Sequence, residues 1–289
     1  MTMRIPRYWT KASYTGTNDR GKSLTCDAWG WSLADPAQAQ EEAASRARRI
    51  FDRLINGARP DKYAYSDRPP REEIVNTVRQ GDKDIAIVTR NRYGALVLNA
   101  ASVLFVDIDY PRIKSQGLWD ALALVFSRRR REQRKAAARE LTLTSVRQWS
   151  QQHADHAFRL YRTCAGLRLL FVDRLYEALS DETRRILAEL GSDPLYCTLT
   201  RTQECFRARL TPKPWRCGSV NPPNQYPWAD SRAEQSYRDW ERRYEKAAGK
   251  YRVCDLVETC GTAAHHDEID TVLALHDEVT CDPANKELA

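Results

Sequence analysis

Ser102-Val-Leu-Phe-Val-Asp-Ile-Asp109 is an apolar run that ends in two carboxylates separated by one isoleucine. Its β-branched and aromatic residues predict a buried strand that closes at the acids. Side chains alternate between the two faces of a strand, so residues two apart point the same way. Asp107 and Asp109 are therefore predicted to converge, and two converging carboxylates are a suitable ligand set for one Mg²⁺ or Mn²⁺ ion.

The segments around this strand predict a mixed α/β fold. Ile85–Thr89 and Ala95–Leu98 precede it as short runs of β-formers separated by turn residues. Phe158–Thr163 and Leu167–Asp173 flank Cys164-Ala-Gly166, which predicts a tight hairpin. Helices are predicted over Pro36–Ile55, Leu118–Leu141, Ser145–His153, Asp181–Leu190 and Arg232–Ala248. Strands and helices alternate without a regular repeat, so we expect a central sheet flanked by helices.

Length and composition indicate one globular protein. The chain has 289 residues, of which 42% are hydrophobic, enough to bury a sizeable core. We predict a single α/β domain over residues 1–289, with a core at about 20–220 and a C-terminal helix–strand extension at about 221–289. The first residues lack the apolar centre of a signal peptide, and no apolar run reaches the ~20 residues of a membrane span. We therefore expect a cytoplasmic protein with no membrane partner, whose eight cysteines are reduced thiols.

The charge balance favours a polyanionic partner. Forty-six Lys and Arg against 39 Asp and Glu give a net charge of +7, which is typical of proteins that bind nucleic acid or nucleotide phosphates. One basic run, Ser127–Lys135, lies in a predicted helix and contains Arg128, Arg129, Arg130 and Arg131. These four arginines are predicted to contact a nucleic-acid backbone, and the alternative is an ordinary solvated helix face.

Arg201–Arg216 is the second basic concentration. Two prolines stiffen it, and Thr211–Trp215 is predicted to be extended. Cations on such a segment can be directed toward a phosphate with little loss of conformational entropy. The predicted phosphate ligands are Arg207, Arg209, Lys213 and Arg216. In the alternative, Trp215 and the prolines pack as a structural plug while the arginines pair with surface acids.

Several common catalytic motifs are missing from the sequence. It contains no Gly-x-x-x-x-Gly-Lys-Ser/Thr loop, Gly-x-Gly-x-x-Gly turn, Gly-x-Ser-x-Gly elbow or His-Glu-x-x-His helix. This argues against the ATPases, dinucleotide enzymes, hydrolases and zinc proteases that those motifs mark. A loose C-terminal Cys/His group lacks the closely paired ligands of zinc modules; its members are Cys254, Cys260, His265, His266, His276 and Cys281.

The order of the motifs resembles the catalytic core of the archaeo-eukaryotic primase superfamily, the primase-polymerases, over about residues 85–216. The first motif of that superfamily is a hydrophobic strand ending in Asp-x-Asp, which Phe105-Val-Asp107-Ile-Asp109 matches. The second is a small residue followed by Gly, a hydrophobic residue and His. Thr163-Cys-Ala-Gly166-Leu-Arg168 matches that layout, with Arg168 in place of the histidine. The third, an acidic motif, has its counterpart in Asp173.

The resemblance implies that Asp107, Asp109 and Asp173 form the catalytic acids, that Asp107 and Asp109 bind Mg²⁺ or Mn²⁺, and that Arg168 grips a phosphate. The chain also resembles a family of uncharacterised bacterial proteins that share segments such as Arg90-Asn-Arg-Tyr-Gly94 and Leu210-Thr-Pro-Lys-Pro-Trp-Arg216. That second resemblance names no activity.

The function expected from these observations is metal-dependent nucleotide binding or nucleotidyl transfer, on nucleic acid or nucleotides. Two alternatives stay open. One is a non-catalytic nucleic-acid-binding protein, in which basic segments contact the backbone and aromatic side chains stack on bases. The other is a structural or protein-interaction role with no phosphate ligand.

Overall fold

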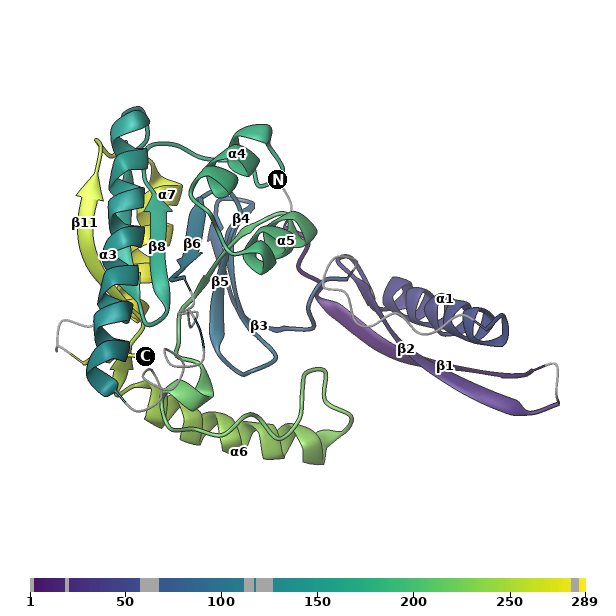
Figure 1. Cartoon of the computed structure of the whole chain (residues 1–289). Coiled ribbons are helices and arrows are strands. Elements are labelled where there is room, and N and C mark those ends of the chain that lie inside the picture. The colour runs from purple at the N-terminus through teal and green to yellow at the C-terminus, as the bar shows by residue number, and fades with distance from the viewer. Residues whose placement is uncertain (1–2, 19–20, 58–67, 112–116, 118–126, 282–285) are drawn as a thin grey trace.

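The computed structural model describes residues 3–18, 21–57, 68–111, 117, 127–281 and 286–289. As predicted, the protein is mixed α/β. It consists of a body that contains two four-stranded sheets and an N-terminal arm that projects from the body (Figure 1).

The arm contains the first three elements of the chain. Strands β1 (Tyr8–Thr17) and β2 (Ser23–Ser32) form an antiparallel hairpin, and α1 (Pro36–Ile55) packs along it. Helix α1 has the bounds predicted from the sequence, because Asp35 caps its first turn and Asn56-Gly57 ends it. Its buried apolar residues, Ala39, Ala43, Ala47 and Phe51, recur every four positions and face the hairpin.

The first sheet of the body has the order β3-β4-β5-β9, and all its neighbours are antiparallel. Its strands are β3 (Glu73–Gln80), β4 (Lys83–Arg90), β5 (Leu96–Ala100) and β9 (Phe206–Arg209). The predictions of strands near β4 and β5 are confirmed. Strand β3 was not predicted, since its sequence is largely polar and its side chains are only partly buried or exposed.

The second sheet has the order β11-β7-β8-β6, again antiparallel. Its strands are β6 (Phe105–Asp109), β7 (Phe158–Thr163), β8 (Gly166–Phe171) and β11 (Cys254–Cys260). The predicted hairpin is confirmed as β7 and β8, which are joined by Cys164 and Ala165. Strand β11 lies within the segment predicted to be a C-terminal extension, and it contributes the edge strand next to β7.

Helices cover both faces of the second sheet. Trp149 of α3 (Arg128–Gln152) packs on Phe158 and Phe171, while His276 of α7 (Asp267–Thr280) packs on Phe105 and Tyr161. The remaining helices are α4 (Asp181–Glu189), α5 (Pro194–Gln203) and α6 (Ser231–Ala248), and the short elements are the 3₁₀ turn η1 (Pro214–Arg216), β10 (Tyr251–Arg252) and β12 (Glu287–Leu288).

Two predictions of local structure, one of a helix break and one of an extended segment, need correction. The predicted break after Leu141 is wrong, because α3 runs without interruption from Arg128 to Gln152. No Gly or Pro lies between the two predicted helices, and Val146 and Trp149 continue the buried side of α3. Residues 118–126 of the first predicted helix lie outside the described residues. The segment predicted to be extended up to Trp215 instead turns at Pro214–Arg216, since proline is well tolerated at the first position of a helical turn.

The two sheets meet at their edges, where β6 lies next to β9. At this junction the Arg168 guanidinium donates to the Arg209 carbonyl oxygen across 3.0 Å. In the part of the chain that the structure describes, no helix combines the length and the apolar character needed to cross a bilayer. All eight cysteines lie among the described residues, and all are free thiols.

Candidate functional site

The two acids of the opening motif lie at the end of β6, at the junction of the sheets. Asp107 is opposite Arg168 of β8, and Asp109 is opposite Gly166. The strands approach so closely there that a Cβ on Gly166 would lie 1.9 Å from the Ile108 carbonyl oxygen. Glycine is therefore required at this position for β8 to pair with the strand that carries the acids.

Arg168 and Asp107 form a buried ion pair. Nε and Nη2 of Arg168 donate to the two carboxylate oxygens of Asp107, at 2.8 and 3.3 Å. The Arg168 side chain is 2% exposed and that of Asp107 is 30% exposed. Burial alone would lower the pKa of Arg168, but the Asp107 carboxylate outweighs it and the net shift is upward. Arg168 thus holds Asp107 in one orientation and links it to β9 through Arg209.

Unlike Asp107, Asp109 has no partner for its carboxylate among the described residues. Its side chain has no hydrogen bond or ion pair to any other described residue, and the residue is exposed. Partial burial of the carboxyl group and the nearby carboxylates of Asp193 and Asp107 raise its pKa, although Lys213 and Arg209 act in the opposite direction. Asp109 is therefore an uncommitted carboxylate beside two others.

A cluster of cations lines the same cavity, which has a volume of about 170 Å³. Its members are Arg209 at the end of β9 and Lys213 and Arg216 in and before η1. None of these three half-buried side chains forms an ion pair or donates a hydrogen bond within the described part of the chain. Burial and the neighbouring cations lower the pKa of Lys213. The cavity thus has cations without protein acceptors on one side and carboxylates on the other.

The segment that carries Lys213 and Arg216 is held rigidly. The buried Tyr244 of α6 donates to the Pro212 carbonyl oxygen at 2.6 Å and lies 2.8 Å from Thr211 Oγ1. Thr211 Oγ1 also accepts a hydrogen bond from the Leu96 amide. These bonds fix the backbone, so Lys213 and Arg216 project from a preorganised segment.

Asp193 also belongs to this site, although sequence reasoning did not identify it. It precedes Pro194 at the start of α5, and its carboxylate caps that helix by accepting from the Leu195 amide. Its own amide donates to the Asp107 carbonyl oxygen at 3.0 Å. The Asp-Pro pair is a recognisable helix start, but nothing local in the sequence shows that this start lies beside Asp107.

Arg207 is not brought into the cavity. Its guanidinium donates to both Glu72 oxygens, at 2.8 and 3.0 Å, and also bonds Gln203. The Arg207 and Glu72 side chains are both more than nine-tenths buried. Glu72 neutralises Arg207, so a role for Arg207 as a phosphate ligand has no support in this geometry.

Asp173 is also separate from the other two acids. It follows β8 at the end opposite to Gly166, five residues beyond Arg168, or roughly 17 Å along an extended chain. Its carboxylate accepts from Tyr176 at 2.7 Å and contacts His156 at 3.3 Å and Arg174 at 3.1 Å. These contacts stabilise the end of the sheet, and they do not bring Asp173 to the metal ligands expected at Asp107 and Asp109.

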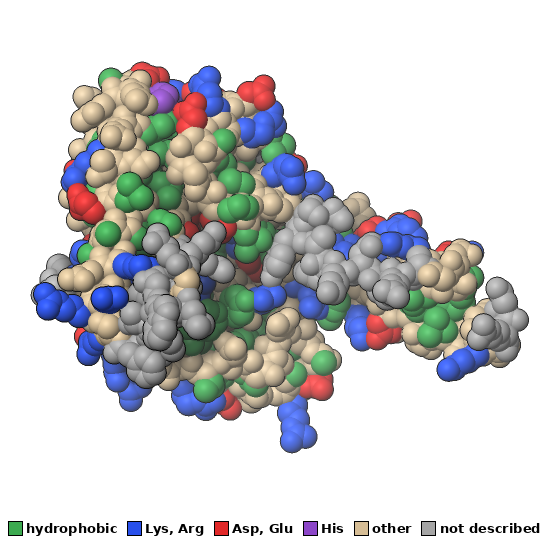
Figure 2. Space-filling view, in the orientation of Figure 1, with side chains coloured by type: hydrophobic (Ala, Val, Ile, Leu, Met, Phe, Trp, Pro, Cys, Tyr) green, Lys and Arg blue, Asp and Glu red, His purple; other side chains and the backbone are tan. Residues whose placement is uncertain are grey.

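The Arg128–Arg131 run forms the first turn of α3, and all four residues are exposed. Thr142 of the same helix borders Asp109, eleven residues from Arg131, so the basic turn lies about 16 Å along the helix axis from the acid. Figure 2 shows Lys and Arg side chains gathered on the lower part of the body, over this end of α3 and along α6. The basic turn thus flanks the site without belonging to it.

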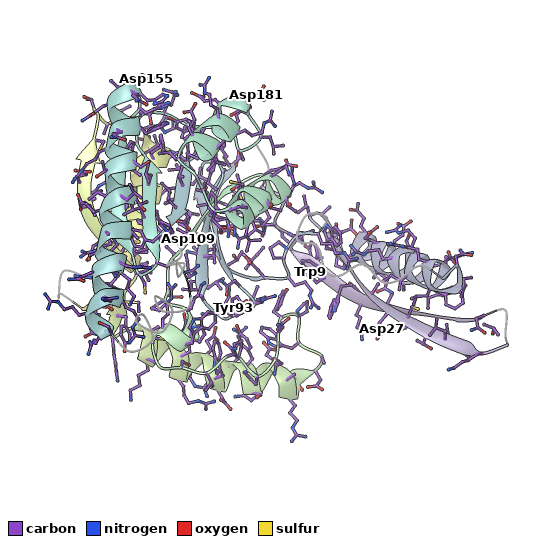
Figure 3. All side chains as sticks on the ribbon, in the orientation of Figure 1. Trp9, Asp27, Tyr93, Asp109, Asp155 and Asp181 are labelled. Atoms are coloured by element: carbon purple, nitrogen blue, oxygen red, sulfur yellow. The ribbon has the colours of Figure 1, made fainter. Side chains whose placement is uncertain are left out.

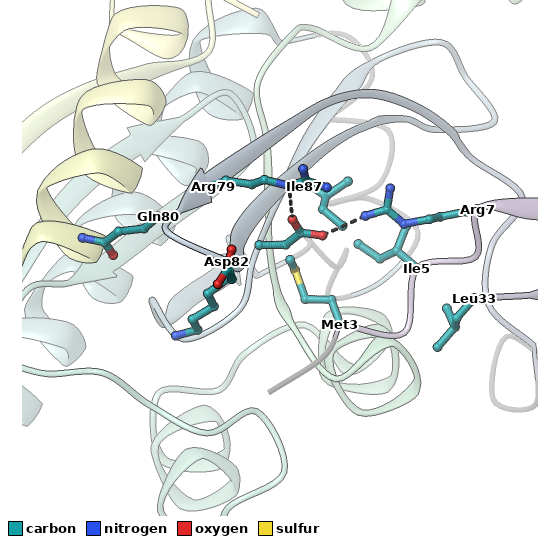
Figure 4. A pocket seen from close by; sticks show the side chains of 10 residues that line it. Met3, Ile5, Arg7, Leu33, Arg79, Gln80, Asp82 and Ile87 are labelled. Atoms are coloured by element: carbon teal, nitrogen blue, oxygen red, sulfur yellow. Dashed lines mark hydrogen bonds and ion pairs between the residues drawn. The ribbon is translucent and has the colours of Figure 1, made fainter.

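A larger hollow lies elsewhere in the described structure. It has a volume of about 620 Å³ and lies between the base of the arm and the β3–β4 hairpin (Figure 4). Its main charges are already paired, because Asp84 accepts from Arg7 at 2.7 Å and from Arg79 at 2.8 Å. This hollow therefore has less unsatisfied charge to offer a ligand than the cavity at Asp109, which Figure 3 places near the centre of the body.

The C-terminal Cys/His residues do not assemble into one site. Cys254 and His276 are buried next to Arg168, and Cys254 Sγ lies 3.9 Å from His276 Nε2. His265 is exposed at the start of α7, near Asp267 and Asp270. That exposed trio is the one set of three metal-type ligand atoms within 4.8 Å of one another among the described residues. Compared with protein-family models, curated proteins and solved structures, the chain gives no match.

Proposed function

We propose that the protein binds the phosphates of a nucleotide together with a divalent cation in the cavity at the junction of the sheets, and that its reaction class is nucleotidyl transfer. The observation that carries this proposal is the arrangement of Arg209, Lys213 and Arg216, three unpaired and half-buried cations, around the same cavity as the uncommitted Asp109.

The charges explain why a ligand is expected there. A partly buried guanidinium without an acceptor is unfavourable, because it has lost water and gained no hydrogen bond. The ionised form of Asp109 is also disfavoured, since partial burial and the nearby carboxylates of Asp193 and Asp107 raise its pKa. A phosphate accompanied by a metal ion would relieve both problems, because its oxygens accept from the cations and the metal neutralises the acid.

The donor set fits a magnesium-like ion. Mg²⁺ is usually bound through one or two carboxylates, with water and substrate phosphates completing its octahedral shell. Asp109 has both oxygens uncommitted, and Asp107 beside it is fixed by Arg168. A bound ion of this kind neutralises and aligns a triphosphate for in-line attack. In this proposal Arg209, Lys213 and Arg216 stabilise negative charge on the phosphates, and Arg168 positions Asp107.

The similarity to primase-polymerases supports the choice of nucleotidyl transfer within phosphate chemistry. The two motifs that carry the similarity, the Asp-x-Asp strand and the Gly-x-Arg strand, are hydrogen-bonded neighbours in the second sheet. The difference at the second motif also has a structural counterpart, because Arg168 is committed to Asp107 and its positive charge is neutralised there. The phosphate-binding role is therefore assigned to the cations of β9 and η1.

The test is calorimetry with each deoxynucleoside triphosphate, with and without Mn²⁺. Asp109→Asn should weaken the Mn²⁺-dependent binding at least about tenfold, because it removes a charged metal ligand. Lys213→Met should weaken binding with and without the metal. Asp155→Asn is a matched control, since Asp155 is an exposed acid beyond the far end of α3 (Figure 3). If Asp109→Asn binds as tightly as Asp155→Asn, the proposal is wrong.

A second candidate function is non-catalytic binding of nucleic acid, and the first turn of α3 favours it. Four exposed arginines stand at the positive end of the helix dipole, with no acid in that turn to offset them. An anionic backbone would compensate this arrangement. Binding of this kind would depend strongly on salt and would not depend on Mn²⁺ or Asp109.

A further inference from the structure

The cavity is too small for a whole nucleotide. Its volume of about 170 Å³ is well below the roughly 300–1,000 Å³ of pockets that enclose a drug-sized ligand. It can accommodate phosphate oxygens and an ion, so the base of any nucleotide or strand bound there has to lie outside. The surface next to Lys213 and Arg216 is where that base would be found.

Two aromatic side chains occupy that surface. Trp215 lies between the cavity residues Lys213 and Arg216 in the chain, and 51% of its surface is exposed, which makes it the most exposed tryptophan among the described residues. Tyr93 of the β4–β5 turn meets it edge to face, with ring centroids 5.2 Å apart. The neighbouring Pro212 and Pro214 are buried. The two prolines therefore pack into the protein, as the structural alternative predicted, but Trp215 remains exposed.

The segments that carry both aromatic residues pack against α6. Gly94 has a φ of +82°, and a Cβ there would lie 2.1 Å from the Trp240 ring, so the turn that carries Tyr93 sits directly on this helix. On the Trp215 side, Tyr244 of the same helix fixes Pro212. A single rigid element thus sets the spacing of the two rings before a ligand arrives.

Cations lie beside both rings. Lys213 Nζ is 5.5 Å from the centroid of the Trp215 ring, and the guanidinium carbon of the exposed Arg92 is 4.5 Å from the centroid of the Tyr93 ring. Positive charge around an aromatic surface favours a ligand that combines a flat π-face with negative charge. The same positive charge disfavours cationic ligands, because Lys213 and Arg92 would repel them. An unpaired nucleobase with its phosphate has the required chemistry.

We infer that Trp215 and Tyr93 form a stacking platform with two faces at right angles, one for each of two unpaired bases of a single-stranded nucleic acid, one of whose phosphates enters the cavity. A mononucleotide would need only the cavity and the nearer ring. The aromatic and cationic surface continues past Trp215 to Tyr93 and Arg92, where the next nucleotide of a longer nucleic-acid strand can bind. This inference rests on the proposed phosphate site for its direction, but the platform can be tested independently.

The test measures fluorescence anisotropy of a labelled oligothymidine strand with Trp215→Leu, Trp215→Phe and Tyr8→Leu. Trp215→Leu should weaken binding roughly 5- to 150-fold, the range for one base–aromatic stack, and Trp215→Phe should recover most of the affinity. Tyr8→Leu, which removes an exposed aromatic ring from the arm, should have no effect. An affinity for Trp215→Leu equal to that of Tyr8→Leu would overturn the inference.

Calorimetry with Mn²⁺ and a deoxynucleoside triphosphate separates the two proposals. If Tyr93→Leu, which removes the ring farther from the cavity, weakens the mononucleotide as much as the strand, the platform serves a mononucleotide and the single-strand assignment is wrong. If Asp109→Asn leaves Mn²⁺-dependent binding intact while Trp215→Leu still weakens the strand, the metal proposal fails and the platform stands. The reverse pattern rejects the platform alone.

Discussion

Removing Asp107 should destabilise the protein more than removing Arg168, although the two residues form one ion pair. The reason is the difference in their exposure, 2% for the Arg168 side chain and 30% for that of Asp107. Asp107→Leu leaves a guanidinium buried without a carboxylate. Arg168→Met leaves a carboxylate that water can reach.

The structure sets the expected magnitudes. An uncompensated buried charge costs about 3–5 kcal/mol, so this is the expected loss for Asp107→Leu. Arg168→Met loses its hydrogen bonds to Asp107 and to the Arg209 carbonyl oxygen, but water reaches the carboxylate that is left, so the expected loss is about 1.5–3 kcal/mol in all. The double variant removes both charges and leaves mainly the Arg209 carbonyl oxygen without its donor, at about 1–3 kcal/mol. The double variant should therefore be more stable than Asp107→Leu alone.

Thermal unfolding at pH 7 measures these differences. At about 2 °C per kcal/mol for a chain of this size, Asp107→Leu should lower Tm by roughly 6–10 °C. Asp239→Leu is the control, because Asp239 and Arg242 form an exposed ion pair on α6 of the kind worth at most about 1 kcal/mol. An equal loss of Tm in Arg168→Met and Asp107→Leu would contradict this prediction, and so would effects of the two single changes that simply add in the double variant.

Two further predictions concern the charges around the site. Folding raises the pKa of Asp109, so protonation of Asp109 favours the folded state; that contribution is present below about pH 4 and is lost as pH rises through the higher folded pKa. Asp109→Asn should therefore raise Tm at pH 7 and have little effect below about pH 4, and a Tm gain of the same size at both pH values would contradict this. Replacing each residue of Arg128–Arg131 by glutamine should make the affinity for single-stranded DNA less dependent on salt. The slope of log affinity against log salt concentration should become less steep by about 0.7 for each phosphate that the turn no longer neutralises. An unchanged slope in the salt titration would mean that this turn of α3 is only a solvated surface.

Local sequence patterns were sufficient for the elements whose signals are local. Helix α1 was predicted with its observed bounds because a capping acid, a proline and a final Asn-Gly mark its ends. The β7–β8 hairpin was predicted because its turn and its two apolar arms are contiguous in the chain. Strand β3 and helix α5 were missed, since the first is polar and the second lies in a stretch without a clear apolar period.

Neighbouring residues alone show that two carboxylates close an apolar strand and that cations concentrate near residue 210. Strand alternation and composition are properties of neighbouring residues. Which of these charges remain available for a ligand depends instead on how distant segments pack. Arg207 is neutralised by Glu72, 135 residues away, and Arg168 by Asp107, 61 residues away, whereas Asp109, Arg209 and Lys213 meet in one cavity. The pairing of charges depends on contacts between distant segments, and those contacts arise when the two sheets come together.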